Sequence, residues 1–361
     1  MEYAFVLVVV LLAFGNGAND NFKGFATVWG ADTLTYRQAL TLATVATVAG
    51  SIASLYLADG LVKQFSGRGL VPDAIAAAPW FIQSVAAGAA LTILVATRAG
   101  FPVSTTHALI GGLIGAGLAA PAGAVALARL GSSFFLPLLL SPLLAAALGL
   151  LAYRGIGRRL ADKDCLCLVP GAPQPAPGGA IAMQGALPAP ARLVMGEQGS
   201  CDALPAPARI GLRAGAHLVH VSSATLICFA RSVNDTPKLA ALLLAASVTG
   251  ARDSMLIIAV AMAAGGLLYA RRVAQTMSKR LARLDNAQGT TANLITAGMV
   301  LLASSVALPV STTHVAVGAI AGVGTGAATI DRATLKNVLL SWVVTLPLAA
   351  IVAFIAALSL R

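Results

Sequence analysis

The chain has 361 residues, of which 58% are hydrophobic and only 10% are charged. Its mean hydropathy of +0.85 excludes a water-soluble globular protein and indicates several membrane-spanning helices. The net charge of +11 does not indicate nucleic acid binding, because most basic residues lie between apolar runs, as they do in the cytoplasmic loops of membrane proteins.

The apolar runs form two sets of five. The first set covers residues 1–30, 39–58, 77–97, 107–120 and 134–153. The second set covers residues 214–248, 254–270, 292–308, 315–328 and 335–358. In each set the fourth run is shorter than the roughly 20 residues that a full crossing needs, so it is expected to form one arm of a re-entrant hairpin. The sequence predicts an all-α polytopic membrane protein with about 10–12 spans.

The segment between the two sets is rich in proline. It holds eight of the chain's 17 prolines, and the heptapeptide Ala-Leu-Pro-Ala-Pro-Ala-Arg occurs at residues 186–192 and 203–209. This composition is typical of an extended or weakly folded linker. We therefore expect a first membrane repeat over residues 1–155, a linker over 156–212 and a second membrane repeat over 213–361.

Three of the four cysteines, Cys165, Cys167 and Cys201, lie in the linker. They could hold a metal ion, but the spacing of a four-ligand zinc site is absent, so plain thiols are the preferred interpretation. The linker and residues 271–283 both carry several lysines and arginines, which predicts that both face the cytoplasm. An odd number of crossings in each set then places both termini outside the inner membrane.

Two polar motifs occur once in each half, in the same order. Residues 19–23 read Asn-Asp-x-x-Lys and recur as residues 234–238. Residues 102–107 read Pro-Val-Ser-Thr-Thr-His and recur as residues 309–314. The matches indicate a duplicated unit, and an odd number of crossings per unit predicts the inverted repeats of secondary transporters, with a site between them near the midplane.

The first motif places charged groups within apolar runs, where each costs about 3 kcal/mol or more, and this predicts a functional site. Amide and carboxylate oxygens suit a small hard cation such as Na⁺. The candidate cation ligands are Asn19, Asp20, Asn234 and Asp235. Structural ion pairs of the two aspartates with Lys23 and Lys238 are the alternative.

The second motif predicts the start of a helix, because proline stops a preceding helix and serine or threonine caps the next one. A helix N-terminus offers free N–H groups and the positive end of the helix dipole, so each copy is a candidate oxyanion site, with simple capping as the alternative. The candidate ligands are Ser104, Thr105, Thr106, Ser311, Thr312 and Thr313. For His107 and His314, helix packing is preferred over a proton relay.

Arg231 lies three and four residues before Asn234 and Asp235, on the same helix face. A guanidinium there is expected to contact an oxyanion or Asp235. Adjacent serine and histidine residues suggest an intramembrane hydrolase, but no G-x-S-x-G motif or triad order accompanies them. We therefore expect no enzyme and no covalent chemistry.

With these paired motifs, the chain resembles the inorganic phosphate transporter (PiT) family of phosphate and sulfate permeases. The resemblance covers both halves and leaves out the linker. It implies a homodimer with an inverted-repeat fold that moves phosphate, or in some members sulfate, together with Na⁺ or H⁺ and without a cofactor. The rival interpretation is a channel-like or sensory membrane protein that binds an oxyanion.

One departure from the family motif concerns coupling. Both copies end in lysine, at Lys23 and Lys238, where the family usually has asparagine. With Asp20, Asp235 and Arg231 these side chains carry a net charge of +1, whereas asparagines would make it −1. Because two fixed ammonium groups can replace bound cations, and because a buried lysine can release its proton, H⁺ is favoured over Na⁺. Both lysines are therefore also expected to contact the substrate.

Overall fold

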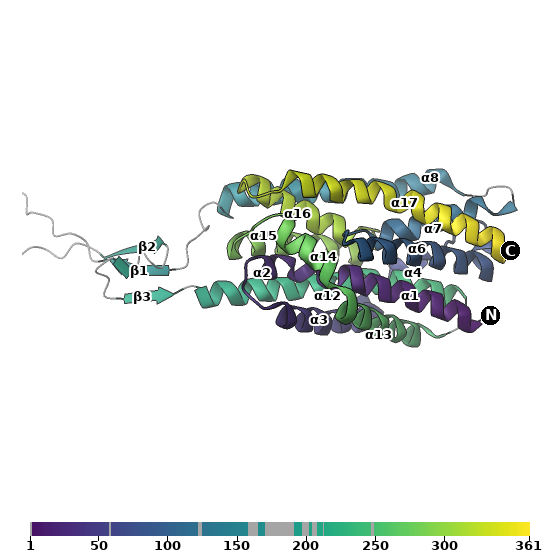
Figure 1. Ribbon diagram of the computed structural model, residues 1–361, viewed down its shortest axis with the longest axis horizontal. Coiled ribbons are helices and arrows are strands. Elements are labelled where there is room, and N and C mark those ends of the chain that lie inside the picture. Colours follow the sequence, from purple (N-terminus) through teal and green to yellow (C-terminus); the bar gives the residue numbers. More distant parts are fainter. Residues whose placement is uncertain are drawn as a thin grey trace, which may run out of the picture.

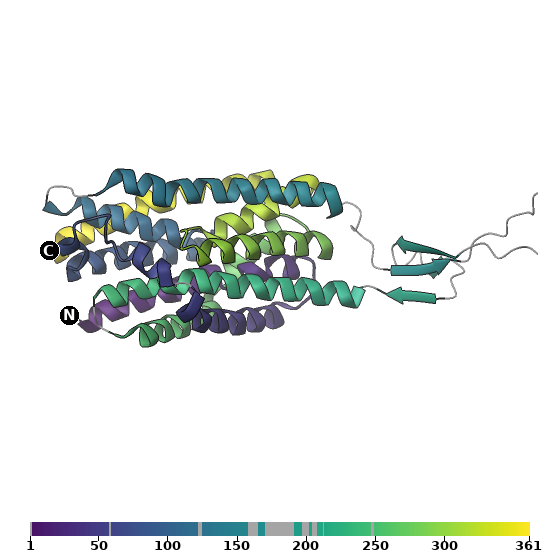
Figure 2. The ribbon, with the colours of Figure 1, turned by 180° about the vertical axis from the view of Figure 1, so that it is seen from behind.

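The computed structural model describes residues 2–57, 59–121, 125–157, 165–169, 191–196, 202–203, 208–211, 213–246 and 249–361. These residues form a long α-helical bundle, with a small β-sheet beyond one of its ends (Figure 1). Both termini lie at the other end of the bundle, as the opposite view also shows (Figure 2).

The helices of the first half are α1 (Glu2–Asp20), η1 (Lys23–Phe25), α2 (Ala26–Gly30), α3 (Tyr36–Leu57), α4 (Asp59–Phe65), α5 (Asp73–Ala76), α6 (Pro79–Ala99), α7 (Thr105–Leu118), α8 (Leu127–Leu130), η3 (Gly131–Phe135), α9 (Leu136–Ala152) and η4 (Tyr153–Gly157). Those of the second half are α12 (Arg213–Ala245), α13 (Ala251–Tyr269), α14 (Arg271–Gln275), η5 (Thr276–Arg280), α15 (Asn286–Ser305), α16 (Thr312–Gly326) and α17 (Arg332–Leu360).

Six helical segments in the described part of the chain are long and apolar enough to cross a membrane: Ala4–Gly30, Tyr36–Leu57, Pro79–Ala99, Leu127–Gly155, Ala251–Tyr269 and Arg332–Leu360. Their outer faces are apolar; Leu143 on α9 and Val343 on α17, for example, are exposed on the surface of the bundle. Helices α7 and α16 have only 14 and 15 residues, in agreement with the two short runs. The predicted all-α polytopic membrane fold is confirmed.

The described parts of the linker form a three-stranded antiparallel sheet. Strand β1 (Cys165–Val169) lies between β2 (Arg192–Gly196) and β3 (Ala208–Gly211). Sγ of Cys165 lies 3.5 Å from Sγ of Cys167, and within the described ranges no three metal-ligating side chains come together. Cys201 and most of both heptapeptides lie outside the described residues. The linker is thus more regular than its proline content predicts, because its apolar stretches pair as strands.

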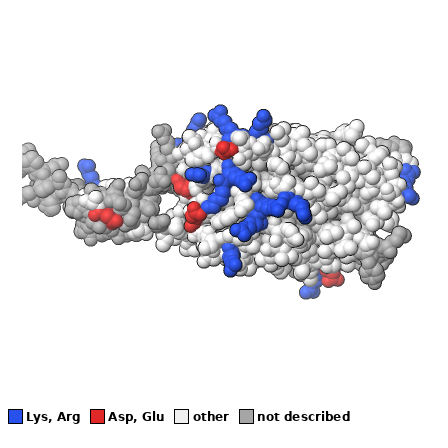
Figure 3. All heavy atoms as spheres, viewed as in Figure 1, with Lys and Arg blue, Asp and Glu red and all other residues white. Residues whose placement is uncertain are grey.

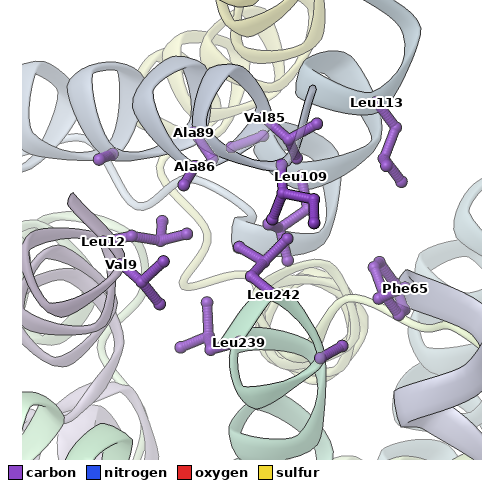
Figure 4. Packing of buried hydrophobic residues seen from close by; sticks show 14 of the residues in the cluster. Val9, Leu12, Phe65, Val85, Ala86, Ala89, Leu109, Leu113, Leu239 and Leu242 are labelled. Atoms are coloured by element: carbon purple, nitrogen blue, oxygen red, sulfur yellow. The ribbon is translucent and has the colours of Figure 1, made fainter. Parts of the chain in front are cut away.

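An aliphatic core packs where α1, α6, α7 and α12 meet (Figure 4). Val9 and Leu12 of α1 lie on the side of Ala86 and Ala89 of α6, and Leu242 of α12 lies close to Leu109 of α7 (Figure 4). The core thereby joins elements of both halves directly beside the duplicated motifs.

The two short helices lie very close to long neighbours, and glycine allows this. A Cβ atom on Gly115 of α7 would lie 2.0 Å from the carbonyl oxygen of Ala350 on α17. A Cβ atom on Gly322 of α16 would lie 2.1 Å from the carbonyl oxygen of Ala146 on α9. Both glycines lie at equivalent positions of the two halves. Backbone-to-backbone packing therefore sets the depth of each short helix, and with it the position of the hydroxyl motif at its start.

Candidate functional site

The two Asn-Asp motifs adopt different backbone shapes. Helix α1 ends at Asp20, and the chain turns before η1 begins at Lys23. The side chain of Asn21 fixes this turn, because its amide donates to Thr44 (2.9 Å) and accepts from Thr47 (2.5 Å) on α3. In the second half, α12 continues unbroken through the motif and through Pro237, so the two copies differ in backbone shape.

The two hydroxyl motifs begin α7 and α16, as the sequence predicts. Ser104 is the N-cap of α7, and its Oγ accepts from the backbone N–H of His107 at 3.1 Å. Ser311 caps α16 in the same way through His314, at 3.2 Å. The capping expected as the alternative is therefore present, and it leaves the hydroxyl hydrogen of each serine available to a further acceptor.

Lys23 connects the first half to the second. Its Nζ donates to Asn19 Oδ1 (2.9 Å), to the carbonyl oxygen of Val103 (2.9 Å) and to Thr313 Oγ1 (2.6 Å), and it forms an ion pair with Asp20. The side chain is only 4% exposed, so this ammonium group is held by protein atoms. The oxygens of Asn19 and Asp20, which the sequence assigned to a cation, thus both face an ammonium group.

Lys238 makes the reciprocal contacts from the second half. Its Nζ donates to Thr106 Oγ1 at 2.9 Å and to the carbonyl oxygen of Val310 at 3.0 Å, and lies 3.5 Å from Asp235 Oδ1. The side chain is fully buried. Each lysine therefore bonds to the proline-containing loop of its own half and to a motif threonine of the other half.

Asn19 and Asn234 hold these loops in place. Asn19 donates to Thr97 Oγ1 (2.8 Å) and to the carbonyl oxygen of Phe101 (3.0 Å), and accepts from the N–H of Val103 (3.1 Å). Asn234 accepts from Ser304, which occupies the position equivalent to Thr97, at 3.2 Å. Asn234 also donates to the carbonyl oxygen of Val310 at 3.4 Å, so each asparagine connects a long helix to the start of a short one.

The two aspartates meet at Asn16. Its Nδ2 donates to Thr105 Oγ1 at 2.8 Å and lies 3.4 Å from Asp20 Oδ2 and 3.3 Å from Asp235 Oδ2. Thr105 Oγ1 itself lies 3.4 Å from Asp20 Oδ2. The amide of Asn16 thereby bridges carboxylates that are 4 and 219 residues away in sequence. Asn16, Asp20, Asp235 and Thr105 form the centre of a buried polar cluster.

Arg231 completes the cluster from α12. Its Nη1 donates to Asn16 Oδ1 (3.1 Å) and lies 3.9 Å from Asp235 Oδ2, while its Nη2 donates to Thr47 Oγ1 (2.7 Å). The predicted contact with Asp235 is therefore present as a long ion pair. The Nε–H of Arg231 is buried and has no partner among the described residues, so the guanidinium retains one unused donor.

The remaining predicted residues lie around this centre. Thr312 is buried in the first turn of α16. The rings of His107 and His314 lie 4.4 Å apart, and His314 stacks on Trp342 at 3.7 Å. Trp342 donates to the carbonyl oxygen of Pro102 at 3.1 Å. The histidines thus pack the two short helices against each other and against α17.

Comparison with known proteins identifies the family. A profile of the phosphate transporter family matches residues 16–353. The chain belongs to the phosphate transporter family. A protein named as a phosphate permease in Thermococcus kodakarensis is 28% identical, over 96% of this chain and 95% of that protein. The chloroplastic inorganic phosphate transporter 2-1 of Arabidopsis thaliana is 27% identical, over 98% of this chain and 71% of that protein.

A solved structure of "The sodium-dependent phosphate transporter" has the same fold. It matches with a TM-score of 0.76 over 99% of this chain and 98% of that chain, at 21% sequence identity. The family resemblance inferred from the duplicated motifs is thereby confirmed, and it agrees with a transport protein rather than an enzyme.

Four polar residues of this phosphate transporter family member were not predicted as part of the site: Asn16, Thr47, Thr97 and Ser304. Asn16 lies four residues before Asp20, as Arg231 lies four residues before Asp235. A comparison of the two Asn-Asp motifs therefore indicates Asn16 as a site residue. Thr97 and Ser304 are also equivalent, because each lies five residues before the proline that begins its hydroxyl motif. For Thr47, the only signal in the sequence is that a polar residue lies within an apolar run.

Proposed function

We propose that this protein is a secondary transporter that carries inorganic phosphate across the inner membrane by alternating access and couples this movement to H⁺ rather than Na⁺. The observation that carries the proposal is the pair of buried lysines that bridge the two halves, Lys23 to Thr313 and Lys238 to Thr106. Membership of the phosphate transporter family supports phosphate as the substrate.

The hydroxyl groups that these lysines hold are the ones assigned to the oxyanion. A phosphate that enters between the starts of α7 and α16 replaces the threonine hydroxyls as the partner of each ammonium group, and receives N–H and O–H donors from both helix starts. These lysine–threonine bonds link the two halves. Replacing them with bonds to the substrate therefore weakens the contact between the halves and at the same time forms the contact with the substrate. The substrate ligands in this proposal are Asp20, Lys23, Ser104, Thr105, Thr106, Arg231, Asp235, Lys238, Ser311, Thr312 and Thr313.

The ammonium group of Lys23 supports coupling without Na⁺. It lies against Asn19 Oδ1, Asp20 and a main-chain carbonyl oxygen, which is the kind of oxygen set that coordinates Na⁺. An ammonium group in such a set neutralises the carboxylate without an ion that must bind and leave. The solved transporter of similar fold is called sodium-dependent, so Na⁺ bound by Asn19, Asp20, Asn234 and Asp235 is the alternative.

The test is uptake of labelled phosphate into proteoliposomes with an imposed Na⁺ or H⁺ gradient. Wild type is expected to respond to the H⁺ gradient and to depend weakly on Na⁺, while the double variant Lys23→Asn/Lys238→Asn acquires a Na⁺ requirement. Lys336→Asn, which removes an exposed lysine of α17, is the matched control and should behave as wild type. A steep Na⁺ requirement of the wild-type protein contradicts the proposal.

Sulfate is the second candidate substrate, because it is also tetrahedral and the hydroxyl-rich helix starts suit either anion. Competition of sulfate and arsenate with phosphate uptake separates the two. Counterflow separates a transporter from a channel-like or sensory protein that binds an oxyanion, because only a carrier exchanges internal unlabelled for external labelled phosphate. The two halves of the chain, 1–155 and 213–361, are proposed to be inverted repeats of each other, with a cytoplasmic 156–212 linker and with both termini outside. Two such chains are proposed to form a homodimer.

A further inference from the structure

We propose a second phosphate-binding site, separate from the buried cluster, in a cavity of about 940 Å³ between α1, α6, α13 and α14. Three arginines line it: Arg98 at the end of α6, and Arg271 and Arg272 on α14. The ligand is a phosphate group, carried either by free phosphate or by the headgroup of a phospholipid. A role of this site in transport rests on the proposed function, whereas binding of the group does not.

The charges of this cavity favour an anion. All three arginines are exposed, and none of the described residues that line the cavity is acidic. Within the described part of the chain, none of the three forms an ion pair with a carboxylate. Figure 3 shows basic side chains gathered over the part of the bundle where α14 lies. Guanidinium groups without carboxylate partners are well suited to bind phosphate oxygens in pairs.

The walls of the cavity are apolar and lead outward. Leu94 and Val95 of α6 line one side, and Leu268 of α13 lines the other. Val95 and Leu268 are exposed on the surface of a bundle that is expected to contact lipid. Arginines beside exposed aliphatic side chains suit a phospholipid. Its phosphate binds the arginines, and an acyl chain lies along the aliphatic side chains. Free phosphate would use only the arginines.

One residue that lines the cavity also contacts the buried cluster. Thr97 lines the cavity, and Thr97 Oγ1 accepts the hydrogen bond from Asn19. Arg272 Nη1 donates to the carbonyl oxygen of Arg98 at 2.5 Å, and Thr276 Oγ1 donates to that of Gly100 at 2.8 Å. These two bonds fix the loop that goes on to Val103, a partner of Lys23. A phosphate group on Arg272 therefore competes with the carbonyl oxygen that anchors this loop, and so links the two sites.

The experiment uses the full-length protein in nanodiscs. Arg98→Gln/Arg271→Gln removes two of the charges and leaves Arg272 to anchor the loop. The matched control, Arg252→Gln/Arg332→Gln, removes two exposed arginines at the starts of α13 and α17. The first arm measures retention of phosphatidylglycerol against phosphatidylcholine by native mass spectrometry. The second measures binding of labelled inorganic phosphate in phosphatidylcholine nanodiscs.

The expected result is at least a tenfold loss of phosphatidylglycerol retention, or of the weaker of two phosphate-binding steps, in the cavity variant alone. A loss in the lipid arm identifies a headgroup as the source, and a loss in the phosphate arm identifies free phosphate. Unchanged binding in both arms, or an equal loss in the control variant, overturns the second site. Arginine-dependent lipid retention in a protein that binds no free phosphate keeps this site but rejects the proposed function.

Discussion

The ion pair of Lys238 and Asp235 offers a direct test of how the buried cluster is stabilised. Both side chains are at most 2% exposed, and Nζ lies 3.5 Å from Oδ1. Lys238→Met keeps an unbranched side chain, one atom shorter, and removes its charge. Asp235 is then left with Arg231 at 3.9 Å and with the amides of Asn234 at 3.1 Å and Asn16 at 3.3 Å. The carboxylate loses its closest cation. Because the other partners remain, the expected cost lies toward the lower end of the range for broken buried ion pairs.

That range is about 3–5 kcal/mol when one partner of a buried pair is removed. We expect Lys238→Met to lower the free energy of unfolding by about 3 kcal/mol, and Asp235→Asn by a similar amount. The double variant should cost clearly less than the sum, because neither charge remains uncompensated. The measurement is a double-mutant cycle on unfolding in mixed micelles, and a coupling energy of about 2 kcal/mol or more is expected.

A second pair in the same protein serves as the control. Lys279 Nζ lies 2.5 Å from Asp32 Oδ1, closer than in the buried pair, but the two side chains are 37% and 81% exposed. The same cycle there should give at most about 1 kcal/mol. If the buried pair couples no more strongly than this exposed pair, burial does not strengthen the interaction and the reasoning is refuted.

Three further predictions concern transport, binding and packing. Asp20→Asn should abolish or strongly depress phosphate uptake in a protein that still inserts and folds, and normal uptake kinetics would exclude Asp20 from the site. Ser104→Ala and Ser311→Ala should each weaken oxyanion binding by about 1–3 kcal/mol, measured by isothermal titration, whereas wild-type affinity in both contradicts a shared site. Gly322→Ala should lower the free energy of unfolding by about 1–3 kcal/mol, because its Cβ would lie 2.1 Å from a backbone oxygen of α9; an unchanged unfolding midpoint would show that α16 moves without cost.

Repetition made much of this molecule predictable from sequence. The Asn-Asp and hydroxyl motifs stand out because charged and hydroxyl groups are rare in long apolar runs, and their second copies remove coincidence. The short helices α7 and α16 and their serine caps followed from proline and from run length alone. Local patterns of this kind depend on neighbours in the chain, which a single sequence contains.

Contacts between distant segments were not predictable in the same way. The reciprocal bonds of Lys23 to Thr313 and of Lys238 to Thr106 join residues 290 and 132 positions apart. Sequence placed both lysines near the site but could not say that each one reaches the other half. The different backbone shapes of the two Asn-Asp motifs were not predictable either: similar motifs end α1 but lie within the continuous helix α12.

Equivalent positions of the two halves also carry different chemistry, and this makes the centre of the cluster asymmetric. Asn16 and Arg231 are equivalent, each four residues before its aspartate, and they bond to each other at 3.1 Å. The guanidinium needs Thr47 as a second acceptor, and the position equivalent to Thr47 holds Met262, which offers only a weak one. Only the second half can therefore hold the arginine. In addition to the two lysines, the duplicated scaffold thus supplies a further cation, Arg231, on α12 and a neutral amide, Asn16, on α1. In the function proposed above, this difference attracts the oxyanion toward α12.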